Sequence, residues 1–241
     1  MLLLASLVPT LSGCRANDTA GELRGAGLSG SVLFQAYSLP EFELTSLGAR
    51  SSFEVGLSTR EPWVDGACRS YWSDVNQDMR ADRQPEAPPG RVEFYVDEAL
   101  VDIGRPEWTA GDILGARASG DVFPAFDVPD ALTAPSGMDD ALPAAIDFEA
   151  DLSLTWEGPF ADGVAISVVK SFTDTADVLS CTFDDDGAAT ISAADLSSVA
   201  PDGNLAEVSL RLGRLAELAT TVDGADLTFT ASATSERAYS R

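Results

Sequence analysis

Histidine is absent from this chain, and lysine occurs only once, as Lys170. Without an imidazole the protein cannot form a Ser-His-Asp triad, a Cys-His nucleophile or a zinc site with a histidine ligand. A Ser-Lys dyad would have to use Lys170, which lies in a strand-like run and in no recognisable catalytic motif. We therefore expect a protein that is not an enzyme, with no catalytic residues and no cofactor. A carboxylate-dependent hydrolase is the less favoured alternative, because no pair stands out among the 39 acidic residues.

Positive charge is also scarce. The 15 Lys and Arg residues are outnumbered by 39 Asp and Glu residues, so the formal net charge is −24 at pH 7. A field of this sign repels nucleic-acid phosphates, and we expect no nucleic-acid partner. Hydrophobic residues make up 45% of the chain, which is enough for a packed core and argues against wholesale disorder.

A short, largely apolar run lies at the start of the chain. It covers residues 2–8 and is followed by Leu-Ser-Gly-Cys at residues 11–14. This arrangement resembles the lipobox of bacterial lipoproteins, in which small residues precede a cysteine that is lipidated after cleavage. The run is shorter than the ~20 apolar residues that a transmembrane helix needs. We expect residues 1–13 to be a lipoprotein signal peptide and Cys14 to be the lipidation site.

The signal departs from the usual pattern in one respect, because no Lys or Arg precedes Cys14. The signal is therefore atypical or translation starts further upstream, and an ordinary secretory signal is the alternative. A lipidated Cys14 would hold the exported protein on a bacterial membrane. Arg15, rather than Asp, follows the cysteine, which favours the outer membrane or cell surface over the inner membrane. The expected partners are the membrane, through the lipid anchor, and other envelope proteins or glycans.

If Cys14 is lipidated, two cysteines are left, Cys68 and Cys181. An even number in an oxidising compartment favours a disulfide. The alternation of residues 179–183 places Cys181 on the same side as Leu179 and Phe183, so a buried free thiol is equally plausible. The sequence leaves these alternatives open.

Period-two alternation of apolar and polar residues recurs along the chain and predicts β-strands. The clearest strands are expected at residues 91–96, 151–156, 164–168, 207–212 and 226–231, with others at 31–37, 53–57, 113–117 and 122–126. Gly213 lowers the helix propensity of the leucine-rich run that follows, and we expect the strand to end at Leu212 and a loop to follow. A capping box from Ser192 to Asp195 predicts one or two turns of helix through Leu196.

The predicted fold class is all-β, with antiparallel β-sandwich domains. The polar, Gly-rich residues 14–30 are typical of a flexible tether, and the Pro-containing residues 127–145 are typical of a connection between domains. We therefore expect a β-rich domain at residues 31–130 and an immunoglobulin-like sandwich at residues 146–241. A single core in the second domain should contain the residues that share the inward phase of its strands: Leu152, Leu154, Trp156, Ile166, Val168, Leu179, Cys181, Phe183, Val208, Leu210, Leu227 and Phe229.

Residues 110–200 resemble a family of predicted bacterial lipoproteins of unknown function. The resemblance rests on a strand ending in Trp156, the Cys-Thr-Phe of residues 181–183, and Thr-Ile-Ser-Ala at residues 190–193 with Leu196. Ser192 stands where the family pattern has proline. The resemblance implies an exported β protein in two parts. It implies no activity, and no functional residue can be transferred from it.

Two groups of residues are candidate sites. Asp184, Asp185 and Asp186 precede Gly187 and could offer oxygen ligands to Ca²⁺, but their spacing favours a solvated hairpin turn instead. The aromatic residues of the second group lie near Cys68, in what we interpret as a loop: Trp63, Tyr71 and Trp72. They could form a ligand-binding platform, although plugging the end of a sandwich is favoured. The function best supported is therefore a non-enzymatic binding or scaffolding role at the envelope, with a carbohydrate- or small-ligand-binding module as the alternative.

Overall fold

The protein is an all-β protein, as the alternation predicts. A computed structural model describes residues 27–42, 44–55, 64–74, 86–101, 107–171, 175–201 and 207–239. The strands are β1 (Leu28–Leu39), β2 (Leu44–Val55), β3 (Ala67–Asp74), β4 (Val92–Val96), β5 (Ala99–Val101), β6 (Ile113–Ala118), β7 (Phe126–Thr133), β8 (Leu152–Thr155), β9 (Gly163–Ser171), β10 (Thr175–Phe183), β11 (Ala188–Ile191), β12 (Glu207–Val222) and β13 (Ala225–Tyr239). The helical segments are α2 (Ala193–Leu196) and the 3-10 turns η1 (Pro40–Phe42), η2 (Asp139–Ala141) and η3 (Ser197–Val199).

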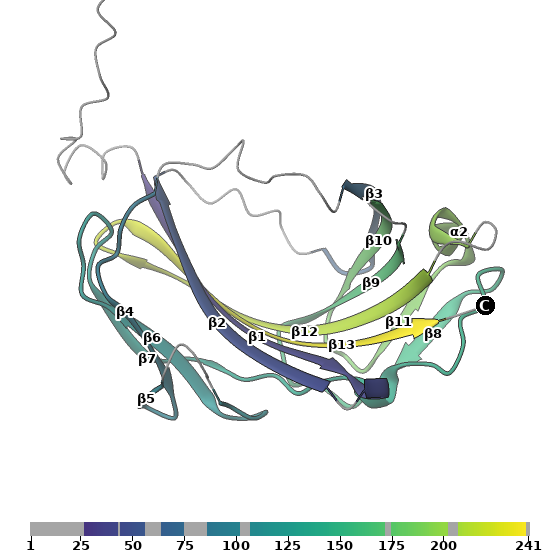
Figure 1. Ribbon diagram of the computed structural model, residues 1–241, viewed down its shortest axis with the longest axis horizontal. Helices are drawn as coiled ribbons and strands as arrows, with labels where there is room; N and C mark the ends of the chain where they lie inside the picture. The colour runs from purple at the N-terminus through teal and green to yellow at the C-terminus, as the bar shows by residue number, and fades with distance from the viewer. Residues whose placement is uncertain are drawn as a thin grey trace, which may run out of the picture.

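One large sheet forms the body of the molecule. It has seven strands in the order β2-β1-β13-β12-β9-β10-β3. Neighbouring strands are antiparallel except β1 and β13, which pair in parallel. In Figure 1 the long strands arch across the molecule, and the four-stranded sheet β5-β4-β6-β7 lies on the outer side of one limb. We call this side of the large sheet its outer face, and the opposite, concave side its inner face.

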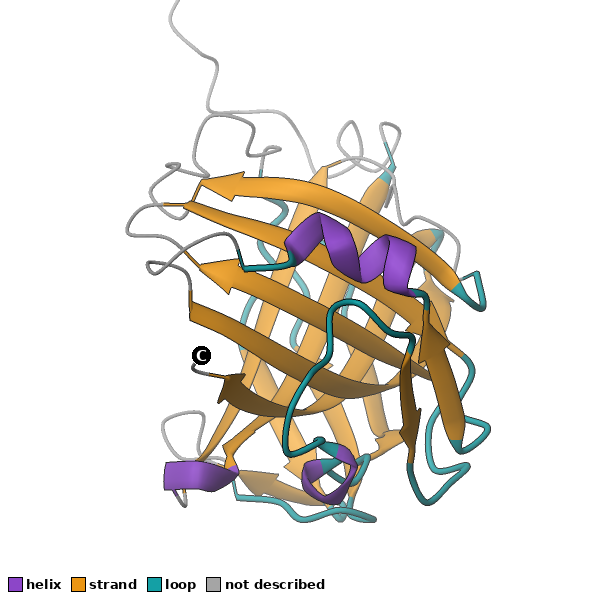
Figure 2. Ribbon diagram, turned by 90° about the vertical axis from the view of Figure 1, so that its right-hand side faces the viewer, coloured by secondary structure: helices purple, strands orange, loops and turns teal. Residues whose placement is uncertain are grey.

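Side chains along a strand point alternately to the two faces of the sheet. The registers of the large sheet bring the apolar positions of neighbouring strands to the same side, the outer face. Along β13, for example, Leu227 and Phe229 point outward, and the register places Val32 of β1 beside Phe229. Two separate cores form on this face. The first lies against the four-stranded sheet, and the second lies against β8, β11, α2 and η3. Figure 2 shows the short helical segment of α2 and η3 lying across the strands.

Strands β12 and β13 run through both layers, so the two domains expected from the sequence do not exist as separate units. The outward residues Leu210 and Leu212 of β12 belong to the second core, whereas Ala216 belongs to the first. The boundaries at residues 31–130 and 146–241 are therefore wrong. The core prediction is confirmed in part: Leu227 and Phe229 pack in the first core, whereas the other ten residues lie in or against the second.

The structure corrects three element boundaries. Strand β12 continues to Val222 because its ladder with β13 is unbroken through Gly213, which is paired with Thr234. The strand expected at residues 122–126 begins only at Phe126, the first residue of β7. That strand includes Pro129, which a register shift in the β6–β7 ladder accommodates. The expected connection at residues 127–145 therefore begins as a strand.

Strand β1 begins within the segment that the sequence assigns to a tether. Residues 28–30, assigned to the tether, are the first residues of β1. The lipobox and residues 14–26 of the tether lie outside the described residues. The predicted helix is confirmed as α2, where the Ser192 side chain accepts a hydrogen bond from the backbone N–H of Asp195.

Candidate functional site

The two cysteines left after Cys14 form a disulfide. Cys68 on β3 lies directly opposite Cys181 on β10, and their sulfurs are bonded. Cys181 is fully buried in the second core, and Cys68 packs partly against it. The bond therefore links the edge strand β3 to its neighbour β10.

Tyr71 and Trp72 neither form a shared aromatic platform nor lie on a loop. They lie on strand β3, and their side chains are 53% and 58% exposed. Adjacent residues of a strand point to opposite faces, so the two rings cannot share one binding surface. Their exposure also argues against a role in plugging the sandwich. Trp63 lies outside the described residues.

The three aspartates do not converge on a common point. Asp186 accepts a hydrogen bond from the backbone N–H of Ala188, two residues along the chain, and Gly187 has a φ of +100°. The backbone N–H of Asp184 donates to the side chain of Asp65. These residues form a turn, but it is not the solvated hairpin favoured from the sequence, because β10 and β11 lie in different sheets and Asp185 is buried. Among the described residues, no three Asp, Glu, Cys or His side chains gather in a group that could hold a metal ion.

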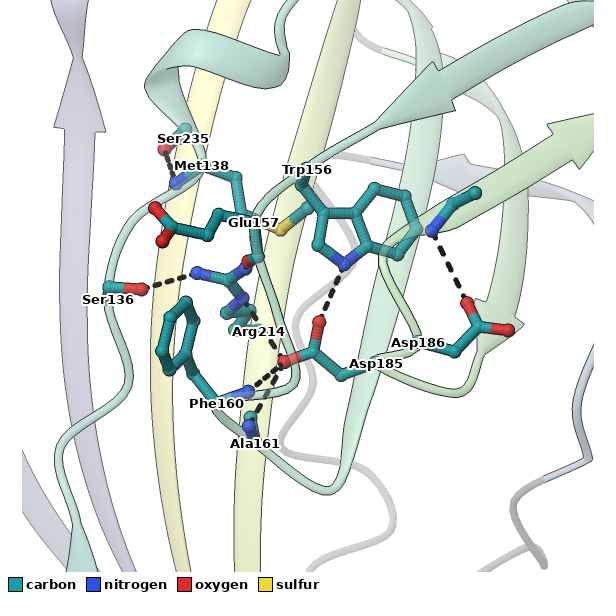
Figure 3. A network of polar contacts seen from close by, with 11 residues as sticks. Ser136, Met138, Trp156, Glu157, Phe160, Ala161, Asp185, Asp186, Arg214 and Ser235 are labelled. Carbon is teal, nitrogen blue, oxygen red and sulfur yellow. Dashed lines mark hydrogen bonds and ion pairs between the residues drawn. The ribbon is translucent and has the colours of Figure 1, made fainter.

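Asp185 has a different role from its neighbours, because its carboxylate points into the molecule (Figure 3). One oxygen accepts a hydrogen bond of 2.6 Å from the indole Nε1 of Trp156. The other accepts the backbone N–H groups of Phe160 and Ala161, at 2.8 and 3.0 Å. The same oxygen lies 3.3 Å from Nε of Arg214. A single carboxylate thus joins the end of β8, the loop that follows it and strand β12.

Arg214 is the partner that makes this network a buried ion pair. Its side chain is 3% exposed and that of Asp185 is 0% exposed. The guanidinium donates to the hydroxyl of Ser136 and to the carbonyl of Glu157, and it lies over the ring of Phe160. Along β12 it separates the residues of one core from those of the other. We interpret the network as the structural boundary between the two cores; within it, Nε of Arg214 is buried with an ion-pair contact to Asp185 but no hydrogen bond.

A second charged cluster lies on the inner face of the large sheet. Glu236 of β13 accepts hydrogen bonds from the hydroxyl of Tyr37 and from Nε of Arg211 on the neighbouring strand. Burial raises the pKa of the Glu236 carboxyl and lowers that of Arg211. Glu236 is therefore the buried member of the pair, whereas the side chain of Arg211 remains 46% exposed.

A cavity with described walls lies at the end of β13. Its volume is about 870 Å³, within the range of small-molecule sites. Its walls come from residues 144–149, from the turn after η3, and from the last residues of β13. Apolar side chains such as Ile146 and Phe148 lie beside Arg237, Tyr239 and Glu41. This cavity is the candidate functional site.

The polar groups of the cavity are held in fixed positions. Nη1 of Arg237 donates to the carbonyls of Leu142 and Pro143, each at 2.9 Å. Nε of Arg237 lies 3.4 Å from the carboxylate of Glu41, and the hydroxyl of Tyr239 donates to the carbonyl of Pro143 at 2.8 Å. The paired charges neutralise each other, yet donors and acceptors remain side by side. The site therefore favours an uncharged ligand with several hydrogen-bonding groups.

The environment of Tyr239 leads to a pH-dependent prediction. Burial raises the pKa of its hydroxyl to about 12, from an ordinary value of 10. The Tyr239 hydroxyl holds its proton more tightly in the folded state than in the unfolded state. Its contribution to the free energy of unfolding is therefore fully present below pH 10 and is lost as the pH rises toward 12. Urea denaturation between pH 9 and 12 should show a steeper loss of stability for the wild type than for Tyr239→Phe. The exposed Tyr71→Phe is the control, and a curve for Tyr239→Phe that parallels the wild type would contradict the assignment.

Sequence reasoning missed this cavity. Residues 144–149 were assigned to the end of a connection and the start of a domain, and no motif marks Arg237 or Tyr239. The alternation of β13 places both residues on the outer face, beyond the last apolar position of that strand. The position of Arg237 and Tyr239 at the end of the strand was the only sequence signal for a site. It indicates a cavity only when residues 144–149, which form the opposite wall, are also located.

The part of the chain that the structure describes includes no helix with the length and apolar character needed to cross a membrane. No family model, no curated protein and no solved structure matches this chain.

Proposed function

We propose that this protein is a lipid-anchored protein of the bacterial cell envelope with a non-enzymatic binding or scaffolding role. The proposed lipid anchor is supported by the lipobox that ends in Cys14, which lies outside the described residues. The composition supports the same proposal, since a formal net charge of −24 suits a protein kept soluble outside the cell. The resemblance of residues 110–200 to predicted lipoproteins is consistent with an exported protein, and the outer membrane or cell surface is its proposed location.

Lipidation makes a direct prediction. In a bacterium that processes lipoproteins, the wild-type chain should sediment with membranes and begin at a Cys14 that carries acyl mass, because two acyl chains suffice for stable anchoring. Cys14→Ser should abolish the added mass and release the protein from the membrane fraction. Mass spectrometry of both forms measures this, with Ser12→Ala as the matched control. Recovery of an unmodified wild-type chain that still begins at Met1 would refute the proposal.

The cavity at the end of β13 supports the second candidate function, a carbohydrate- or small-ligand-binding module. Sugars are bound by an apolar or aromatic wall together with donors and acceptors that lie close to one another. Phe148 and Tyr239 supply the wall, and the paired Arg237 and Glu41 supply a donor group and an acceptor group. An uncharged oligosaccharide fits this combination better than a charged ligand does.

Binding can be measured by calorimetry with chitotriose and maltotriose as probes. We expect saturable binding of at least one of them by the wild type. Arg237→Met should weaken that binding by about tenfold, because it removes hydrogen bonds to a charged group. Arg91→Met, at an arginine whose side chain is 80% exposed, is the control. Absence of binding by either probe, or equal binding by both variants, would rule out an oligosaccharide site in this cavity.

A further inference from the structure

Strand β2 forms one edge of the seven-stranded sheet, with β1 on its other side. Among the described residues, its free side is bridged only at its end, where Glu54 lies opposite Glu86 and the N–H of Ala87 donates to the carbonyl of Phe53. Residues 45–52 of the strand lie beyond that bridge. Their backbone groups on this side face away from the sheet.

The hydrogen bond from Ala87 identifies which residues face away. In an antiparallel ladder, alternate residues turn both their N–H and C=O groups to the same neighbour. Since the carbonyl of Phe53 points away from β1, the odd-numbered residues Thr45, Leu47, Ala49 and Ser51 present their backbone groups at the free edge. The even-numbered residues are bonded to β1 instead. The edge therefore offers four N–H donors and four C=O acceptors in the spacing of a strand.

Natural edge strands are usually protected by proline, by several charges or by a covering segment. Residues 45–52 contain no proline and a single charged residue, Arg50. The side chains at the two ends of this stretch are exposed, including Thr45, Ser46, Ser51 and Ser52. Within the described residues this is a long edge of mostly small side chains with no covering segment, and such an edge has the properties of a surface built to accept another strand.

A cavity of about 290 Å³ lies beside this edge. Thr45 and Leu47 form one wall, and the buried Trp108 and Pro135 are among the residues that complete it. Strand addition takes its affinity from backbone hydrogen bonds and its specificity from pockets for alternate side chains. The cavity has the size for one apolar side chain of an added strand.

We propose that β2 binds an extended, basic segment of a partner polypeptide as an eighth strand, with one apolar side chain in the cavity at Leu47 and Trp108. Charge selects this partner. The carboxylates of Glu54 and Glu86 flank one end of the edge, and that of Asp139 lies at the other end, where it accepts a hydrogen bond from Ser38 opposite Thr45. A second copy of the chain is disfavoured because each copy carries a net charge of −24.

The test uses a labelled heptapeptide that alternates lysine with valine and leucine, and the full folded chain. Amide hydrogen exchange measured by NMR gives the decisive result. In the free protein the amides of residues 45, 47, 49 and 51 should exchange quickly, and those of 46, 48 and 50 slowly. Saturating peptide should slow the odd-numbered amides by at least about tenfold, because each gains a backbone hydrogen bond. The even-numbered amides should change little.

Two variants separate strand addition from attraction by charge alone. Ser51→Pro removes one outward N–H without removing a bond to β1, and it should weaken peptide binding by about tenfold. Gly48→Ala is the control, because a Cβ at Gly48 would have no atom within 4 Å, and it should bind like the wild type. If Ser51→Pro does not fold, the exchange pattern of the wild type still decides the question.

A peptide with the same lysines and a central proline gives the last comparison. It retains the charge but cannot form a continuous strand, and it should bind at least tenfold more weakly. The proposal is overturned if both peptides bind equally, if the odd-numbered amides remain fast at saturation, or if the alternating peptide shows no saturable binding.

Discussion

Replacing Asp185 with alanine should lower the free energy of unfolding by about 3–5 kcal/mol, which is a large fraction of the stability of a typical domain. The change leaves the guanidinium of Arg214 buried without its counter-charge. It also leaves the indole N–H of Trp156 and the backbone N–H of Phe160 without their acceptor. The cost is high because water cannot easily reach side chains that are 0–3% exposed.

Urea denaturation followed by circular dichroism measures this loss. Asp186→Ala is the matched control, since Asp186 is the next residue and contacts only its own turn; it should cost less than about 1 kcal/mol. The double variant Asp185→Ala, Arg214→Met should be less destabilised than the sum of the two single variants, because no buried charge is left unpaired. Equal losses from Asp185→Ala and Asp186→Ala would mean that the ion pair is not a structural boundary.

Reduction of the disulfide should have an effect of similar size. The bond between Cys68 and Cys181 closes a loop with a sequence separation of 113 residues. In the chain-entropy account, a loop of this length contributes about 4–5 kcal/mol through its restriction of the unfolded chain. Cys68→Ala should therefore lose about this amount, with strand β3 losing its order first because it is the edge strand that the bond holds.

The control for this prediction is the reductant itself. Dithiothreitol should destabilise the wild type to the level of Cys68→Ala and should leave Cys68→Ala unchanged. Urea denaturation of the four samples gives the comparison. Equal stability of the oxidised and reduced wild type would contradict the predicted contribution of the bond.

The local pattern of the sequence predicted most strands, but it could not predict their partners. Alternation gives the phase of a strand, so it correctly assigned Leu227 and Phe229 to a buried face. It says nothing about which layer covers that face. Strand β13 lies between β12 and β1. Because β1 comes from the opposite end of the chain, this parallel pair has no signature in either strand alone.

The failure at β12 has a specific cause. We expected the strand to end at Leu212, before Gly213, but Leu210, Leu212, Arg214 and Ala216 continue as one row on the outer face. Arg214 is tolerated there only because Asp185, from a distant turn, lies within 3.3 Å of its Nε. Asp185 was grouped with its neighbours as a candidate calcium ligand because its contact with Arg214 cannot be seen in the sequence. A buried ion pair between remote residues is invisible until the fold brings them together.

The parallel pairing of β1 with β13 has a consequence for how the chain reaches its native state. The first strand cannot join its permanent neighbour until the last 15-residue strand has been made. Contacts between such distant parts of a chain close slowly, since a long loop must be ordered before they form. We therefore expect the large sheet to assemble only after synthesis is complete. A chain that remains open for that long can be threaded through a membrane channel without first being unfolded.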